Sequence, residues 1–426
     1  MVSRNTPRYS ILATILALTL FGSGYLVGLT TSRAAAFSDA SADAPPGVAS
    51  TFGVFWQAWN LAEQHYVNRQ ALDPTKMTYG AVAGMLSALG DDGHTRFLSP
   101  ADVQSQQESL SGHIVGIGVQ VSLNNGRTVV VRPFAGSPAQ QAGLRSGDEI
   151  VAVDGQSVDG LSITQVSTLI RGAAGTPVTL STVHDGETTP IEVSVVRATV
   201  TVPSVSWAIV PGTQTAHVLV SKFSEHTTDE LVRALTAARS AGATSLILDL
   251  RDDPGGLRDE AIGVASQFIA SGDVLLERDA QGELQPYPVR PDGVAVDVPL
   301  AVLINAGSAS SSEIVAGAIQ DHQRGPLVGA TTFGTGTVLS VYPLADGSAI
   351  YLGTAEWLTP NGRQIWHHGI IPDDALALPA SGRVLTPDDV RALSASDFAA
   401  SQDVQLLRAV QLVDPSYATS APATTP

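Results

Sequence analysis

One stretch of the sequence combines a nucleophile with an element that could activate it. The apolar run PLAVLIN, residues 299–305, is typical of a buried strand, and AGSASSSEIVAGAIQDH, residues 306–322, leads from a small-residue loop into a helix. A helix N-terminus presents unpaired N–H groups and positive potential, which stabilise an oxyanion. Ser310 could therefore attack a carbonyl carbon. The same spacing also suits a structural role, because Ser310 and Glu313 match a capping box.

The elements around this serine alternate between strands and helices. AHVLVSKF (216–223) and SLILDL (245–250) are apolar, as expected for strands buried in a sheet. TTDELVRALTAARSAG (227–242) and DEAIGVASQFIASG (259–272) have the pattern of helices. We therefore expect an α/β core over residues 201–380, followed by a helical region, 381–415, and a disordered tail, 416–426.

Residues 112–200 form a separate unit of short β-branched runs divided by Gly, Pro and Asp. The segment GSPAQQAGLRSGDEIVAVDGQSV, residues 136–158, resembles a PDZ domain. The resemblance implies that the unit binds the free C-terminal tail of a protein or peptide by adding it as a strand to a sheet edge. It also implies a loop whose N–H groups hold the terminal carboxylate, GIGV, which comprises Gly116, Ile117, Gly118 and Val119.

A wider resemblance links these parts. Residues 304–373, the segment LRDDPGG and the segment GDDGHTRFL resemble the carboxyl-terminal processing peptidases, serine endopeptidases that act outside the bacterial cytoplasm. The resemblance extends from about residue 52 to 413. It implies an α/β multidomain fold with an N-terminal helical region (51–111), a PDZ domain and a ClpP/crotonase-like α/β peptidase core.

The same resemblance assigns roles to residues of the α/β core. Ser310 matches the family's nucleophile, and Gly255 or Gly256 would line the oxyanion hole with the N–H of Ser311. Asp321 matches an acidic position, which we interpret as an architectural hydrogen-bond acceptor.

The sequence departs from the family at Thr335, where the family has a lysine that takes the serine's proton. A threonine hydroxyl cannot act as a base near neutral pH. The chain has two lysines, Lys76 and Lys222, and neither occupies this position. A Ser–Lys dyad is therefore not expected.

Histidine, with an ordinary pKa near 6.5, can replace the amine as proton acceptor. Of the nine histidines, His94 in GDDGHT resembles the base of the tricorn-like branch of the same clan, which a later glutamate orients. Glu356 lies in about the right region to be that glutamate, although it could instead pair with an arginine such as Arg363. His367 and His368 lie in a late loop, WHHG, whose placement the sequence does not indicate. The prediction is a Ser310–His94–Glu356 arrangement.

Composition and the N-terminus limit the functional class. A net charge of −17 argues against nucleic-acid binding, and no disulfide can form because cysteine is absent. No metal or other cofactor is implied. Residues 11–30 are uncharged and long enough to span a membrane, with Arg4 and Arg8 before them.

We expect residues 1–36 to be a membrane anchor or a cleaved signal, 37–50 a linker, and the remaining chain extracytoplasmic. The alternative function is a non-catalytic, anchored PDZ binding protein.

Overall fold

The computed structural model describes residues 48–91, 94–124, 126–134, 136–184, 187–380, 382–414 and 416–417. The chain divides into two compact units: the first comprises Met1–Ala101 and Val341–Tyr351, and the second comprises Asp102–Ser340 and Leu352–Pro426. The predicted anchor, residues 11–30, lies outside the described residues. Within the described ranges, no helix is both long and apolar enough to cross a membrane.

The first unit contains the helices expected near the N-terminus. They are α2 (Ala49–His65), the 3₁₀ helix η1 (Arg69–Ala71) and α3 (Pro74–Ser87), followed by strand β1 (Arg96–Leu98). Helix α3 begins at a proline, and the Asp73 side chain caps it by accepting the N–H groups of Thr75 and Lys76. Strand β1 pairs antiparallel with Ala349–Tyr351. Helix α2 includes residues 49 and 50, which the prediction placed in the linker.

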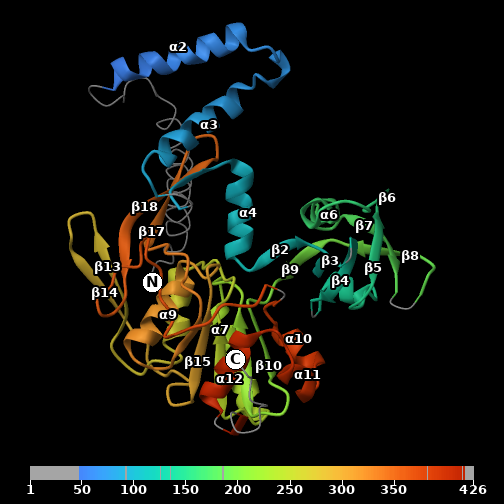
Figure 1. Ribbon diagram of the computed structural model, residues 1–426. Coiled ribbons are helices and arrows are strands. Elements are labelled where there is room, and N and C mark those ends of the chain that lie inside the picture. The colour runs from blue at the N-terminus through green and yellow to red at the C-terminus, as the bar shows by residue number, and fades with distance from the viewer. Residues whose placement is uncertain are drawn as a thin grey trace, which may run out of the picture. The chain divides into compact units, whose positions relative to one another are not determined.

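The expected PDZ region is an antiparallel sheet in the order β3-β4-β5-β7-β8, with β6 paired to β5 (Figure 1). Its members are β3 (Val119–Asn124), β4 (Arg127–Pro133), β5 (Glu149–Val153), β6 (Gln156–Ser157), β7 (Pro177–Val183), β8 (Ile191–Val196), α5 (Pro138–Gln141) and α6 (Ile163–Ile170). A two-stranded pairing of β2 (His113–Gly116) with β9 (Ala198–Thr201) joins the segments that enter and leave this sheet.

The α/β core is built on a second sheet in the order β10-β11-β12-β15-β16-β19. Its strands are β10 (Val205–Ile209), β11 (Thr215–Val220), β12 (Ser245–Asp249), β15 (Leu300–Ile304), β16 (Leu327–Gly329) and β19 (Asp374–Ala375). All neighbours except β10 and β11 run parallel. The carboxyl ends of β11, β12 and β15 therefore meet at one edge, which is where ligands bind in open α/β sheets.

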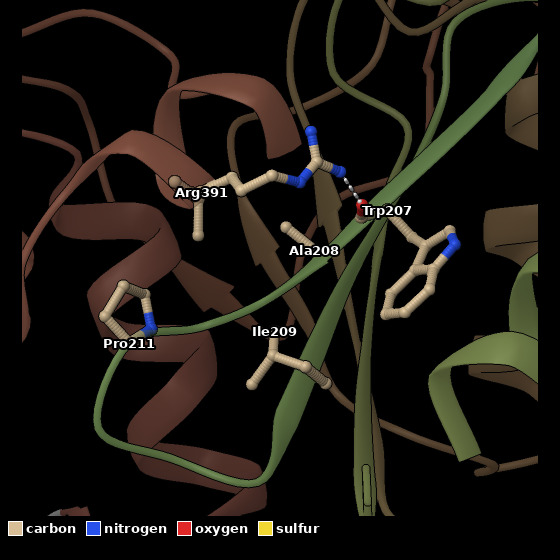
Figure 2. Close-up of a pocket in the computed structure, with 6 residues that line it drawn as sticks. Trp207, Ala208, Ile209, Pro211 and Arg391 are labelled. Atoms are coloured by element: carbon tan, nitrogen blue, oxygen red, sulfur yellow. Dashed lines mark hydrogen bonds between the residues drawn. The ribbon is translucent and has the colours of Figure 1, made fainter. Parts of the chain in front are cut away.

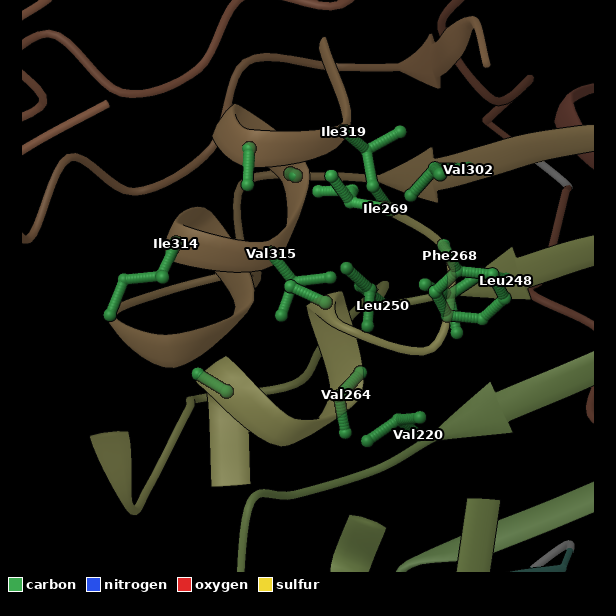
Figure 3. Close-up of a cluster of buried hydrophobic side chains, with 14 of the residues drawn as sticks. Val220, Leu248, Leu250, Val264, Phe268, Ile269, Val302, Ile314, Val315 and Ile319 are labelled. Carbon is green, nitrogen blue, oxygen red and sulfur yellow. The ribbon is translucent and has the colours of Figure 1, made fainter. Parts of the chain in front are cut away.

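Both faces of this sheet are covered, which explains why its strands are apolar throughout. Alternate residues such as Leu248, Leu250 and Val302 pack against α7 (Thr227–Ser240), α8 (Arg258–Ala265) and α9 (Ser311–Asp321) (Figure 3). Their neighbours Ile247 and Leu303 pack on the opposite face against α10 (Pro387–Ala392), α11 (Ala395–Ala399) and α12 (Val404–Val413).

Two features of the second unit were not expected from the sequence. Strands β13 (Asp273–Asp279) and β14 (Leu284–Pro288) form a hairpin. Strand β13 also pairs with residues Ala355–Leu358 of β18 (Ala349–Leu358). Strand β17 (Thr337–Pro343) precedes β18 in the chain. Tyr417, predicted to lie in the disordered tail, packs instead against the cluster that contains Phe398.

Candidate active site

Ser310 occupies the N-cap position of α9, directly after the loop that leaves β15. Its backbone has φ 55° and ψ −116°, whereas other serine caps in the chain, Ser137 and Ser162, have φ near −70° and extended ψ. A non-glycine residue in this region is strained, and such strain persists where the surroundings hold it in place. The Ser310 N–H donates to the Glu313 carboxylate (2.9 Å), as in a capping box, but the Ser310 backbone has a conformation that an ordinary cap does not need.

The glycine-rich loop after β12 lies directly on Ser310. Gly255 has φ 90°, and a Cβ there would lie 2.7 Å from the Cβ of Ser310. A Cβ on Gly256, with φ 150°, would lie 2.1 Å from the carbonyl oxygen of Phe223. The Ser311 hydroxyl donates to the Gly256 carbonyl (3.0 Å). Glycine is therefore required at both positions for the loop to approach the start of α9 so closely.

The structure distinguishes between the amide groups proposed for an oxyanion hole. The Gly255 N–H donates to Asp253 Oδ1 at 2.8 Å, so it is already engaged. The N–H groups of Gly256 and Ser311 donate to no other group among the residues that the structure describes. These two amides, from two contacting loops, are the stronger candidates for stabilising negative charge beside Ser310.

Asp253 is a buried acid beneath this loop that the sequence analysis did not single out. Its carbonyl accepts the Ala309 N–H (3.0 Å) and the Ser312 hydroxyl (2.9 Å), which ties the loop to the start of α9. Its Oδ2 has no hydrogen-bond partner within the described ranges. Burial raises the pKa of the Asp253 carboxyl well above its usual value.

Lys222 lies close enough to Asp253 for their charges to interact. Burial lowers the pKa of the Lys222 amine, and the nearby Asp253 carboxyl partly opposes that shift. The amine also donates to the Ser109 hydroxyl. Lys222 follows β11 and thus lies at the same sheet edge as Ser310.

The Glu313 carboxylate joins the start of α9 to the loop that contains Thr335. Oε2 accepts the N–H groups of Ser310 (2.9 Å) and Thr335 (2.8 Å). Oε1 accepts the Thr332 hydroxyl (2.5 Å) and the Gly334 N–H (2.7 Å). Glu313 is only 1% exposed. One buried side chain therefore fixes the backbone of Ser310 relative to residues 332–335.

The side chain of Thr335 shows no sign of a catalytic role. Its side chain is 2% exposed, and within the described residues its hydroxyl has no hydrogen-bond partner. The position where the resemblance implies a lysine thus holds a short, buried side chain.

The loop WHHG, residues 366–369, runs beside the Thr335 loop. The His367 N–H donates to the Gly334 carbonyl (3.0 Å), and the Ile370 N–H donates to the Thr332 hydroxyl (2.7 Å). A Cβ on Gly336 would lie 2.1 Å from the Trp366 nitrogen, so the two loops are in close contact. This placement could not be predicted from residue spacing because the loops are about thirty residues apart.

The other predicted residues lie as follows. His94 belongs to the first unit and Ser310 to the second, so their pairing stays a prediction. Glu356 forms an ion pair with Arg278, its register partner on β13, and not with Arg363. Arg363 instead binds Asp321, which also accepts the Asn361 N–H (2.8 Å), so the interpretation of Asp321 as an architectural acceptor is confirmed.

The GIGV segment connects β2 to β3. Gly116 ends β2 and Val119 begins β3, while Gly118 has φ 74° and no room for a Cβ, which would lie 2.5 Å from Ser137. Ile117 is 1% exposed and belongs to the core of the sheet. The segment therefore contributes main-chain groups and one core side chain.

A buried ionic network supports the glycine-rich loop from the opposite face of the sheet. Arg251 binds Asp249 through Nε (2.9 Å) and Nη2 (2.7 Å), and binds Asp403, the N-cap of α12, through Nη1 (2.8 Å). His217 Nε2 is 2.9 Å from Asp249 Oδ2. Although burial alone would raise it, the pKa of Asp249 is well below its usual value because Arg251 and His217 stabilise the charged form.

A pocket elsewhere in this unit lacks comparable chemistry. Figure 2 shows it between β10 and α10, lined by Trp207, Ala208, Ile209, Pro211, Val390 and Arg391. The Arg391 guanidinium donates to the Trp207 carbonyl (2.6 Å) and closes part of the strand edge. No group of His, Cys, Asp and Glu in the described part of the chain could hold a metal ion. The edge that carries Ser310 is therefore the candidate active site.

Comparisons with known proteins identify the family of two regions of the chain. The profile described as "Peptidase family S41" matches residues 214–376, and the profile described as "PDZ domain" matches residues 129–183. The chain is 34% identical over 349 residues to a carboxyl-terminal-processing protease of Synechocystis, covering 80% of this chain and 81% of that protein.

It is also 35% identical over 310 residues to a carboxy-terminal processing protease of Bacillus subtilis, covering 73% and 66%. A solved structure of a putative S41 protease from Bacteroides fragilis superposes with a TM-score of 0.54 at 18% identity, covering 80% of this chain and 95% of that one, which bears on the fold alone. The predicted fold class, a PDZ domain with an α/β peptidase core, is confirmed.

Proposed function

Because the chain belongs to the carboxyl-terminal processing proteases of peptidase family S41, we propose that it hydrolyses peptide bonds through an acyl-enzyme on Ser310, with an imidazole as the proton acceptor. One observation carries the proposal. Ser310 is held in a left-handed backbone conformation beside two amide groups, those of Gly256 and Ser311, that donate to no other described group.

The reaction follows from these positions. Ser310 Oγ attacks the scissile carbonyl carbon as its proton passes to the base, and the carbonyl oxygen becomes an oxyanion. The amides of Gly256 and Ser311 stabilise that charge, and loss of one such donor typically costs about 10²–10³ in kcat. The C–N bond then breaks as the base protonates the leaving amine, and water hydrolyses the ester by the reverse proton path.

The proposal must also name the residue that accepts the proton from Ser310. Lys76 lies in the first unit, and the Lys222 amine is engaged with Ser109 and Asp253. His94 is the candidate that the sequence suggests, with Glu356 to orient it. Because Arg278 already binds the Glu356 carboxylate, that carboxylate would have to serve both partners.

The substrate class follows from the PDZ domain. We infer that it holds the free C-terminus of a protein substrate at the GIGV loop, as PDZ domains do when they add a peptide strand to a sheet edge. The name of the Synechocystis relative, a carboxyl-terminal-processing protease, agrees with cleavage near that end. We also infer an extracytoplasmic location, with residues 1–36 as an anchor or a cleaved signal.

A fluorophosphonate probe tests the function. The wild-type chain is expected to be labelled on Ser310, and Ser310→Ala is expected to lose both the label and hydrolysis of a peptide with a free C-terminus. A wild-type chain that binds such tail peptides but takes no label and cleaves none would instead be the non-catalytic PDZ binding protein.

A further inference from the structure

The loop WHHG offers an imidazole to the site from within the same unit as Ser310. Its backbone is bonded to the loop where the family has its lysine, while the Thr335 side chain there is short and buried. We propose that His367 is the general base that takes the proton from Ser310. This inference rests on the proposed function and names a residue for its undefined step.

Three hydrogen bonds lead from Ser310 to His367 through the Glu313 carboxylate and the Gly334 backbone. The N–H groups of Ser310 and Thr335 donate to the same Glu313 oxygen, so the two residues lie within two hydrogen-bond lengths of each other. Gly334 donates to the other oxygen of that carboxylate (2.7 Å), and its own carbonyl accepts the His367 N–H (3.0 Å). His367 is therefore attached to the backbone beside the family's lysine position.

Close packing fixes this neighbourhood. The Phe333 N–H donates to the Ser308 carbonyl (3.0 Å), and Gly336 lies so close to Trp366 that no side chain fits between them. The Thr332 N–H also donates to the Ile370 carbonyl (3.2 Å). Hydrogen bonds and close packing thus join the Ser310 loop, the Thr335 loop and the WHHG loop to one another.

His367 has the properties that a base needs. Its backbone is left-handed, with φ 61°, and its ring stacks on that of Trp366 at 4.7 Å between centroids. The residue is exposed, so its ring can rotate about χ1 and can exchange protons with water. A positive φ is uncommon for a non-glycine residue, and Ser310 shares this property. In a substrate-free enzyme the hydrogen bond between base and nucleophile is often not yet formed.

Five other histidine rings among the described residues of this unit lie beside partners of their own. Four rings bind elsewhere: His113 to Thr201, His184 to Asp148, His217 to Asp249 and His322 to the Asp273 carbonyl. The ring of His226 lies at the start of α7 beside Asp229 (3.8 Å). His368, the neighbour of His367, donates its N–H to the Ile365 carbonyl (2.9 Å) and provides a matched control.

The proton balance is simple. The Ser310 O–H bond breaks as Oγ bonds to the substrate's carbonyl carbon, and the proton moves to the His367 ring. The imidazolium then gives that proton to the amine nitrogen as the C–N bond breaks. In the second half, His367 takes a proton from water and returns it to Ser310 Oγ as the ester bond breaks.

The test compares fluorophosphonate labelling rates and peptide hydrolysis in full-length variants. His367→Gly removes the ring and places glycine where φ is positive, so this variant is expected to fold at least as well as wild type, with an equal or higher thermal midpoint. We expect it to lose about 100-fold or more in kcat/KM, the usual contribution of a general base. Added imidazole is expected to restore part of the lost activity to His367→Gly and none to Ser310→Ala.

Control variants distinguish a wrong assignment of the base from a wrong assignment of the peptidase function. His368→Ala is expected to stay within about threefold of wild type, well below the loss of a general base. A His367→Gly variant that is labelled as fast as His368→Ala would overturn the proposal, and so would a loss found in His94→Ala but not in His367→Gly. If the wild-type chain itself takes no label, the proposed peptidase function fails first, which is a distinguishable result.

Discussion

Replacing Glu313 with glutamine tests whether one carboxylate organises the active site. The wild-type side chain accepts four hydrogen bonds, from Ser310 N, Thr335 N, Gly334 N and the Thr332 hydroxyl. An ionised carboxylate accepts at both oxygens, whereas glutamine replaces one acceptor with an NH₂ donor. The substitution keeps the shape and changes only the hydrogen bonding.

The free-energy cost of the substitution depends on which way the new side-chain amide is oriented. With Nε2 on the Oε2 side, the N–H groups of Ser310 and Thr335 both lose their acceptor. With Nε2 on the Oε1 side, the Gly334 N–H is stranded and the Thr332 hydroxyl must turn, although it also accepts the Ile370 N–H. The second arrangement is the less unfavourable one, because it strands a single amide. A buried donor left unsatisfied costs about 1–3 kcal/mol.

This free-energy cost should make the wild-type position of Ser310 less populated. A penalty of about 1–3 kcal/mol shifts a local equilibrium by roughly 5- to 150-fold, so we expect a fluorophosphonate labelling rate lower by about that factor. Urea unfolding should show a lower midpoint as well.

Glu260→Gln is a matched control. Glu260 also accepts main-chain N–H groups at a helix start, those of His226 and Thr228 at α7. We expect it to lose stability without a matching loss of labelling. Wild-type labelling and an unchanged midpoint in Glu313→Gln would refute the reasoning.

Three further substitutions probe the surroundings. The folded-state pKa of Asp253 is raised above the unfolded value of about 3.9, so this group's contribution to stability is lost as pH rises from about 4. Asp253→Asn should therefore unfold at a higher urea concentration than wild type at pH 8, with a smaller difference at pH 4. Arg251→Met removes the guanidinium that binds the buried carboxylates of Asp249 and Asp403 and should cost about 3–5 kcal/mol in urea unfolding. Gly256→Ala puts a Cβ 2.1 Å from a main-chain carbonyl oxygen, and because the loop must move, labelling should fall by at least about tenfold, the effect of losing part of an oxyanion hole.

The sequence was informative wherever a local pattern decides structure. The apolar runs of β11, β12 and β15 predicted a sheet covered on both faces, and hydrophobic clusters do cover both faces. The small-residue loop before α9 predicted Ser310 at a helix start, where the structure has it. These features depend on residues near one another in the chain, which is why their spacing is enough.

Contacts between distant segments were not predictable in the same way. Glu356 pairs with Arg278 because β13 and β18 are in register, and the hairpin that contains β13 was not expected. The WHHG loop lies beside Gly334 through main-chain hydrogen bonds, which leave no trace in residue type. Glu313 matched a capping box in the sequence, yet three of its four bonds reach residues about twenty positions later.

The way Glu313 binds the Thr335 loop allows the side chain at position 335 to vary without disturbing the backbone of Ser310. At residues 334 and 335 it binds only main-chain N–H groups, which every residue except proline provides. The loop's path, and with it the backbone of Ser310, therefore does not depend on which side chain stands at 335. If the resemblance holds at this position, exchanging lysine for threonine removes a base while the backbone geometry stays the same. The position of the base is thus separable from the position of the nucleophile, so an imidazole from a bonded neighbouring loop can take over the proton transfer without any change in the sheet edge that holds Ser310.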